Sequence, residues 1–226
     1  MIRLVLFDID GTLIRTNGAG VKAFGLALET QFKIANGIHD VKFAGRTDTG
    51  VAREVFLRHG IEPSAENFQH FFDCYAHWLG HILTETRGEV CQGIGELILE
   101  LESLPQPPVI GLLTGNIRLG AEIKLRHYRL WQFFRTGGFA DDHEERDQIA
   151  VIARERGCRL LGEPLRDEQV IVIGDTPLDI QCGKAINARV LAVATGSSTV
   201  EELKAHRPDW VVKDLDGITV EDLCRL

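Results

Sequence analysis

Four short, unbroken apolar runs constrain the fold of this chain more than any other feature. They occupy residues 4–7, 109–113, 170–173 and 190–193. Such runs are typical of strands buried on both faces, as in a parallel sheet. Helical spacing of apolar residues lies between them, over 117–130, 147–156 and 199–206, and a weaker strand is expected at 210–212. This alternation predicts an α/β fold with a doubly wound parallel sheet.

One long stretch after the first run interrupts the alternation. It contains no clear buried strand, and its apolar residues recur at helical spacing in three groups that begin near Val21, Val51 and Phe68. We therefore expect a small all-helical domain at residues 16–87, inserted after the first strand. Residues 1–15 and 88–226 would then form the α/β core, with the insert above the carboxyl ends of the strands.

The charge balance and the cysteines limit the partners of the chain. With 25 Lys and Arg against 33 Asp and Glu, the net charge of −8 disfavours a nucleic-acid partner. The longest basic cluster, Lys124 to Arg129, is expected to be the exposed face of a helix. Five cysteines, without a CxxC pair, fit a reducing compartment better than a disulfide framework. No apolar run approaches the roughly 18–20 residues needed to cross a bilayer. We predict a cytoplasmic protein, a monomer, with no membrane partner.

Polar side chains directly follow three of the apolar runs. In open α/β sheets ligands bind beyond the carboxyl ends of the strands, so these side chains are expected to meet. They are Asp8 and Asp10 after the first run, Thr114 and Asn116, on either side of Gly115, after the second, and Asp175 and Asp179 after the third. Carboxylate oxygens suit Mg²⁺, and a Thr-Gly-Asn turn before a helix suits a phosphate. The alternative is that Thr114, Asp175 and Asp179 only cap helices or complement their dipoles, but the paired Asp8 and Asp10 favour a cation.

These residues carry a resemblance to a known family. Residues 8–13 (DIDGTL), 112–116 (LLTGN) and 173–180 (IGDTPLDI) resemble the first, second and fourth motifs of the haloacid-dehalogenase-like (HAD) superfamily, and 193–196 (VATG) is also typical of it. The order and spacing resemble its phosphoglycolate-phosphatase-like members. The predicted helical insert is similar to the cap that such members carry after their first motif.

The resemblance implies a mechanism. Asp8 would be the nucleophile that takes the phosphoryl group, and Asp10 would protonate the leaving oxygen and later deprotonate a water molecule. Mg²⁺ would be held by Asp8, the backbone carbonyl of Asp10, Asp175 and Asp179. Thr114, Gly115 and Asn116 would bind the phosphoryl oxygens.

The third motif of the family, usually a lysine, has no obvious counterpart. Lys124 comes too early, on the helix after Thr114, whereas Arg146 lies just before a predicted helix. An arginine supplies a fixed positive charge and a two-pronged phosphate contact, so Arg146 is our candidate.

Two features of the insert have competing interpretations. Arg46, in the loop 44–48, either contacts the substrate, as such loops do in the family, or forms a surface salt bridge. His70, Asp73, His77 and His81 share one side of a predicted helix and could bind zinc. Because the apolar stripe lies about a third of a turn away, we expect them on a solvated flank instead.

The expected function is hydrolysis of a small phosphorylated metabolite by a Mg²⁺-dependent phosphatase, through an aspartyl-phosphate. Three alternatives use the same core. They are a phosphomutase, a phosphonate hydrolase with Lys22 or Lys42 forming a Schiff base, and a binding module without activity. A dehalogenase is disfavoured because Asp10 is present.

Overall fold

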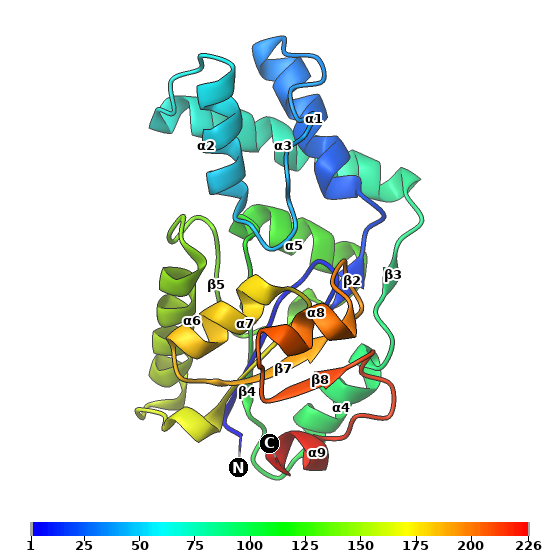
Figure 1. Ribbon diagram of the computed structural model, residues 1–226, viewed down its shortest axis with the longest axis vertical. Helices are drawn as coiled ribbons and strands as arrows, with labels where there is room; N and C mark the ends of the chain where they lie inside the picture. Colours follow the sequence, from blue (N-terminus) through cyan, green and yellow to red (C-terminus); the bar gives the residue numbers. More distant parts are fainter. Residues whose placement is uncertain (1, 226) are drawn as a thin grey trace.

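The computed structural model describes residues 2–225, and a six-stranded sheet lies at its centre (Figure 1). The strand order is β5-β4-β1-β6-β7-β8, and every neighbouring pair is parallel. The strands of this sheet are β1 (Leu4–Phe7), β4 (Val109–Leu113), β5 (Thr136–Gly138), β6 (Val170–Gly174), β7 (Arg189–Val193) and β8 (Trp210–Val212). The predicted doubly wound parallel sheet is confirmed. β5 was not predicted, because its Thr-Gly-Gly sequence contains no apolar run.

Every residue of β1, β4 and β6 is buried, because helices cover both faces of the sheet. One face packs on α4 (Ile94–Ser103), α5 (Arg118–His127) and α9 (Val220–Arg225). The other face packs on α6 (Arg146–Leu161) and α7 (Pro177–Ala185), while α8 (Val200–Ala205) covers the β7 side. Successive side chains of β1 alternate between the two layers, with Val5 and Phe7 in the first and Leu4 and Leu6 in the second.

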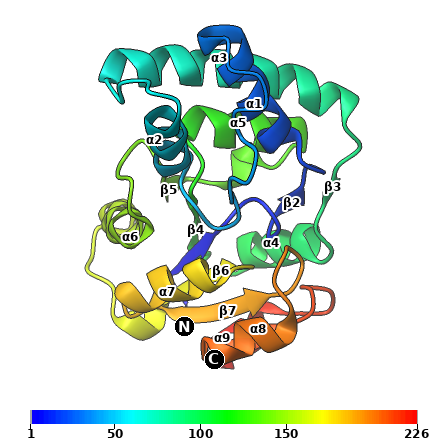
Figure 2. The same cartoon turned by 45° about the horizontal axis from the view of Figure 1, so that its top comes forward.

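Three helices follow the first strand, as the apolar spacing predicts. They are α1 (Ala19–Phe32), α2 (Asp48–Arg58) and α3 (Ala65–Glu85), and they bury a hydrophobic cluster of their own around Phe24, Phe56 and Phe71. Figure 2 shows α1 and α3 lying over α5, beyond the sheet. A short antiparallel pair, β2 (Ile14–Arg15) and β3 (Glu89–Val90), joins the two points where the chain leaves and re-enters the sheet region.

Within residues 2–225, none of the helices has the length and apolar character required to cross a membrane.

Candidate active site

Three buried carboxylates converge beyond the carboxyl ends of β1 and β6. Asp8 directly follows β1, Asp175 directly follows β6, and Asp179 lies in the first turn of α7. One carboxylate oxygen from each lies within 4.8 Å of the others, and the three residues are 1–6% exposed. Asp8 and Asp175 lie close together because β1 and β6 are neighbouring strands. The short connection from β6 into α7 brings Asp179 to the same place. The strand-end argument therefore correctly places these residues together.

Asp179 also has a structural role. Thr176 is the N-cap residue of α7, its hydroxyl accepts a hydrogen bond from the Asp179 backbone, and Asp179 Oδ2 accepts from the Thr176 backbone N–H at 2.9 Å. This reciprocal pair uses one carboxylate oxygen, while Oδ1 is the oxygen that faces Arg146. Capping and site formation thus coexist in one side chain.

The electrostatics of the carboxylate cluster favour a bound cation. Burial, followed by repulsion from Asp179, raises the pKa of Asp8 to about 7. Burial and repulsion from Asp179 and Asp8 raise the pKa of Asp175 well above its usual range, although Thr12 donates a hydrogen bond of 3.1 Å to its Oδ1. Three buried oxygens at this spacing suit a divalent metal ion, which would supply the missing positive charge.

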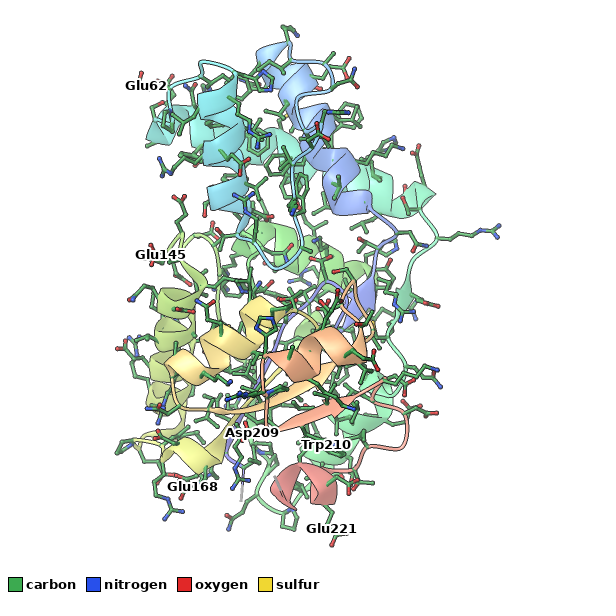
Figure 3. All side chains as sticks on the ribbon, viewed as in Figure 1. Glu62, Glu145, Glu168, Asp209, Trp210 and Glu221 are labelled. Atoms are coloured by element: carbon green, nitrogen blue, oxygen red, sulfur yellow. The ribbon has the colours of Figure 1, made fainter. Side chains whose placement is uncertain are left out.

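Arg146 is the first residue of α6, and its guanidinium is buried in this cluster. Its Nη2 lies 3.4 Å from Asp8 Oδ1 and also donates to Asp179 Oδ1, while Nη1 donates to the Gly45 carbonyl at 3.1 Å. Figure 3 labels the preceding residue, Glu145, at the end of α6 that lies toward α2. The structure therefore brings Arg146 to the proposed nucleophile, as the sequence argument required.

Lys124 corrects the sequence analysis. It was expected on an exposed helix face and was set aside as too early in the chain, but its side chain is 4% exposed. Its Nζ donates to Asp10 Oδ2 and to Asn116 Oδ1, each at 2.6 Å. The face of α5 that carries Lys124 packs toward the site beneath α3, so the residue is part of the site.

The Thr-Gly-Asn turn lies beside Asp10. Asn116 Nδ2 donates to Asp10 Oδ2 at 2.9 Å and to the Thr114 hydroxyl at 2.8 Å. The Asp10 carboxylate thus faces Lys124 and Asn116, outside the carboxylate trio of Asp8 and its neighbours. A Cβ on Gly115 would lie 2.2 Å from the Arg46 carbonyl oxygen, so only glycine fits where the loop before α2 crosses this turn.

The loop before α2 reaches the chamber through Arg46, and the first residue of α2, Asp48, also lines it. The Arg46 guanidinium pairs with Glu54 at 2.6 Å and donates to the Lys42 carbonyl at 3.2 Å. Asp48, which the sequence analysis did not select, accepts from the Ile117 backbone at 2.9 Å and donates its own N–H to the Gly115 carbonyl at 2.7 Å. Burial raises the pKa of Asp48 to about 6.

These elements enclose a chamber of about 300 Å³ above Asp8 and Asp10. Its lining comes from both parts of the chain, including Arg46, Asp48, Tyr75, Lys124 and Arg146. Lys22 and Lys42 are exposed and are not among the lining residues, which argues against a Schiff-base lysine. His70, His77 and His81 are exposed on α3, on the solvated flank that was expected for them.

A comparison with protein families identifies the class of protein. The model of the haloacid dehalogenase-like hydrolases matches residues 5–193. The chain belongs to this family, and the prediction of a HAD-like enzyme is confirmed.

Similar proteins in the family span the whole chain. The pyrophosphatase PpaX of Bacillus mycoides is 26% identical over 218 residues, which cover 96% of this chain and 95% of that protein. The solved structure of CbbY from Rhodobacter sphaeroides, in complex with phosphate, has a TM-score of 0.75 at 16% identity and covers 99% of both chains. A hydrolase from Pseudomonas syringae has a TM-score of 0.70 at 18% identity, covering 95% of this chain and 94% of that one. These two structures share the fold.

Proposed function

We propose that this protein is a Mg²⁺-dependent phosphatase that hydrolyses a small phosphorylated metabolite through an aspartyl-phosphate. The observation that carries the proposal is the position of Asp8. It lies at the floor of the chamber, next to the Arg146 guanidinium and within the carboxylate trio. The similarity to a protein named pyrophosphatase and to a structure with bound phosphate supports a phosphorylated substrate.

In the first step, an Asp8 carboxylate oxygen attacks phosphorus, and the bond from phosphorus to the leaving oxygen breaks. Asp10 gives its proton to that oxygen. In the second step a water molecule attacks the same phosphorus, Asp10 takes the water proton, and Asp8 leaves as a carboxylate with release of phosphate. Asp10 suits both roles because its carboxylate is oriented by Lys124 and Asn116 and lines the chamber.

The metal would be held by the carboxylates of Asp8, Asp175 and Asp179 and by the backbone carbonyl of Asp10. When bound, Mg²⁺ would neutralise the repulsion between an anionic carboxylate and an anionic phosphate. The phosphoryl oxygens would be bound from the other sides by Arg146, which lies in the carboxylate cluster, and by the turn of Thr114, the Gly115 backbone and Asn116.

Residues 16–87 would act as a cap over this reaction. The cap loop contacts the catalytic region through Gly45, which accepts from Arg146, and Asp48, which donates to the Gly115 carbonyl. Such closure excludes water from the phosphoryl group. Arg46 would contribute to the wall of the chamber, with its charge shared with Glu54. A cytoplasmic location belongs to the same proposal, because five free cysteines suit a reducing compartment.

The test is phosphate release from para-nitrophenyl phosphate and from a panel of phosphorylated metabolites, with Mg²⁺ or with EDTA. We expect phosphate release in Mg²⁺ but not in EDTA, and we expect Asp8→Asn to abolish the release in Mg²⁺. Asp73→Asn, an exposed carboxylate on α3, is the matched control and keeps wild-type rates. Equal release in EDTA or from Asp8→Asn would refute the proposal.

A further inference from the structure

The part of the chamber beyond Asp10, into which the leaving group would extend, has an unusual balance of charge. Three cationic side chains line the chamber, and all three are already paired with protein groups. Lys124 is held by Asp10 and Asn116, Arg46 by Glu54, and Arg146 by Asp8 and Asp179. Within residues 2–225, each cation that lines the chamber already has an anionic partner, with which a negatively charged leaving group would have to compete.

A carboxylate adds to this balance. Asp48 enters the chamber from the start of α2, and its Oδ2 accepts from the Ile117 backbone, the one donor to this carboxylate in the part of the chain that the structure describes. Its other oxygen is available to accept a hydrogen bond. The inorganic phosphate that leaves when pyrophosphate is cleaved would bring its own negative charge close to both Asp10 and Asp48, at a cost that the already paired lining cations offset only in part.

The remaining wall is aromatic and apolar. Phe24 contacts Phe43 and Tyr75, with ring centroids 5.2 and 5.9 Å apart, and Val21 and Val51 complete this side. An apolar wall of this kind matches the carbon atoms of an organic leaving group, since burying apolar surface on both sides is favourable.

Tyr75 supplies a polar group within that wall. The residue is 1% exposed and lines the chamber together with Gly20 and Lys124. The hydroxyl lies near Lys124, because a Cβ placed on Gly20 would be 3.7 Å from the Tyr75 hydroxyl and 3.4 Å from Lys124 Nζ. A hydroxyl at this position can donate a hydrogen bond to a ligand in the chamber and accept one from it.

Resting on the proposed phosphatase activity, we infer that the substrate is a compact phosphate ester whose leaving group is a neutral, hydroxyl-bearing carbon chain, with pyrophosphate a poor substrate. Tyr75 and Asp48 bind the hydroxyls of the leaving group, and Phe24 and Phe43 pack on its carbon atoms. The volume of about 300 Å³ limits the ester to a few carbons, because it is at the small end of the range for ligand pockets.

The experiment compares kcat/KM for glycerol 3-phosphate, erythrose 4-phosphate, ribose 5-phosphate and pyrophosphate, with acetyl phosphate as the reference that carries no hydroxyl. At least one hydroxylated ester should exceed pyrophosphate by about tenfold or more, since the difference is one or two buried polar contacts. Pyrophosphate equal to or better than every ester would overturn the inference.

Two variants test the assigned residues. Tyr75→Phe and Asp48→Asn should each lower the ratio of kcat/KM for the best ester to that for acetyl phosphate by about tenfold. Tyr128→Phe is the control, because Tyr128 is not among the residues that line the chamber, and within residues 2–225 its buried hydroxyl has no partner. An unchanged ratio in both chamber variants would overturn the assignment. Absence of Mg²⁺-dependent release even from acetyl phosphate would instead refute the phosphatase activity itself, and the inference with it.

Discussion

The guanidinium of Arg146 is the cation that the structure places among the buried carboxylates, so its removal should be measurable without any substrate. Its side chain is 8% exposed, and it contacts Asp8, Asp179 and the Gly45 carbonyl. Arg146→Met leaves two buried carboxylates without their partner, which costs about 3–5 kcal/mol of the free energy of unfolding. For a chain of 226 residues, about 2–4 °C per kcal/mol gives a fall in Tm of about 6–20 °C.

The pH dependence of that loss has a definite sign. Because the pKa of Asp8 is raised to about 7, the folded protein binds more protons than the unfolded chain between roughly pH 4 and pH 7. Stability therefore falls as pH rises through this window, and removing Arg146 extends the window upward. The loss in Tm should be largest near pH 8, and smaller at pH 5.5, where a proton on Asp8 replaces the missing charge.

Thermal unfolding in EDTA at both pH values, followed by circular dichroism, measures this difference. Arg53→Met is the control, because Arg53 forms a half-exposed ion pair with Glu144 that contributes about 1 kcal/mol at most. Adding Mg²⁺ at pH 8 should restore part of the lost Tm, since the metal binds the folded state alone. A Tm at pH 8 equal to that of the wild type, or the same loss at both pH values, would refute this account of the cluster.

Three further predictions follow from the site. Lys124→Met should lower kcat for para-nitrophenyl phosphate by about 10–100-fold, part of what general acid–base catalysis contributes, because Asp10 loses the 2.6 Å contact that orients it. The control is Lys204→Met, at an exposed position. An unchanged kcat in Lys124→Met would contradict the orienting role of Lys124. The Kd for Mg²⁺, measured by calorimetry, should weaken by about tenfold per unit as pH falls below 7, since Asp8 must lose its proton to bind metal; a constant Kd from pH 7 to 5.5 would be inconsistent with this. Gly115→Ala should raise KM and cost about 1–3 kcal/mol of stability, because its Cβ would lie 2.2 Å from a carbonyl oxygen of the loop before α2; wild-type KM and Tm would show that this contact is dispensable.

The sheet was largely predictable because its strands are buried on both faces. β1, β4, β6 and β7 each consist of a run that has few other structural interpretations. β5 is different, because its residues have little room for side chains. A Cβ on Gly138 would lie 2.5 Å from the Ile149 carbonyl oxygen of α6. Close packing of a helix on a strand leaves no apolar signal in the sequence of that strand. α4 was also not predicted, although Ile94, Leu97, Ile98 and Leu101 have helical spacing.

The site was predictable where strand ends define it and unpredictable where tertiary packing does. Asp8 and Asp175 lie together because β1 and β6 are neighbours, which is a property of the fold class. Lys124 was misplaced because helical periodicity gives the faces of α5 but not which of them packs toward α3 and the site. Similarly, the sequence analysis selected Arg46 but not Asp48, because the contact of Asp48 with the Ile117 backbone and the pairing of Arg46 with Glu54 depend on tertiary packing.

The short β2–β3 pair has a consequence for how a substrate could enter. Both chain crossings lie side by side there, so α1, α2 and α3 are tethered to the core along one edge, drawn at the right of Figure 1. At the opposite edge α2 contacts the core without a covalent link, through Thr47 and the Glu144 carbonyl at 2.8 Å. In the role of the proposed cap, these helices would hinge at β2 and β3 and open most widely at the α2 side. The substrate entrance would then lie beside Glu144 and Glu145. An anionic ester would pass these two acidic side chains before it reaches Arg146.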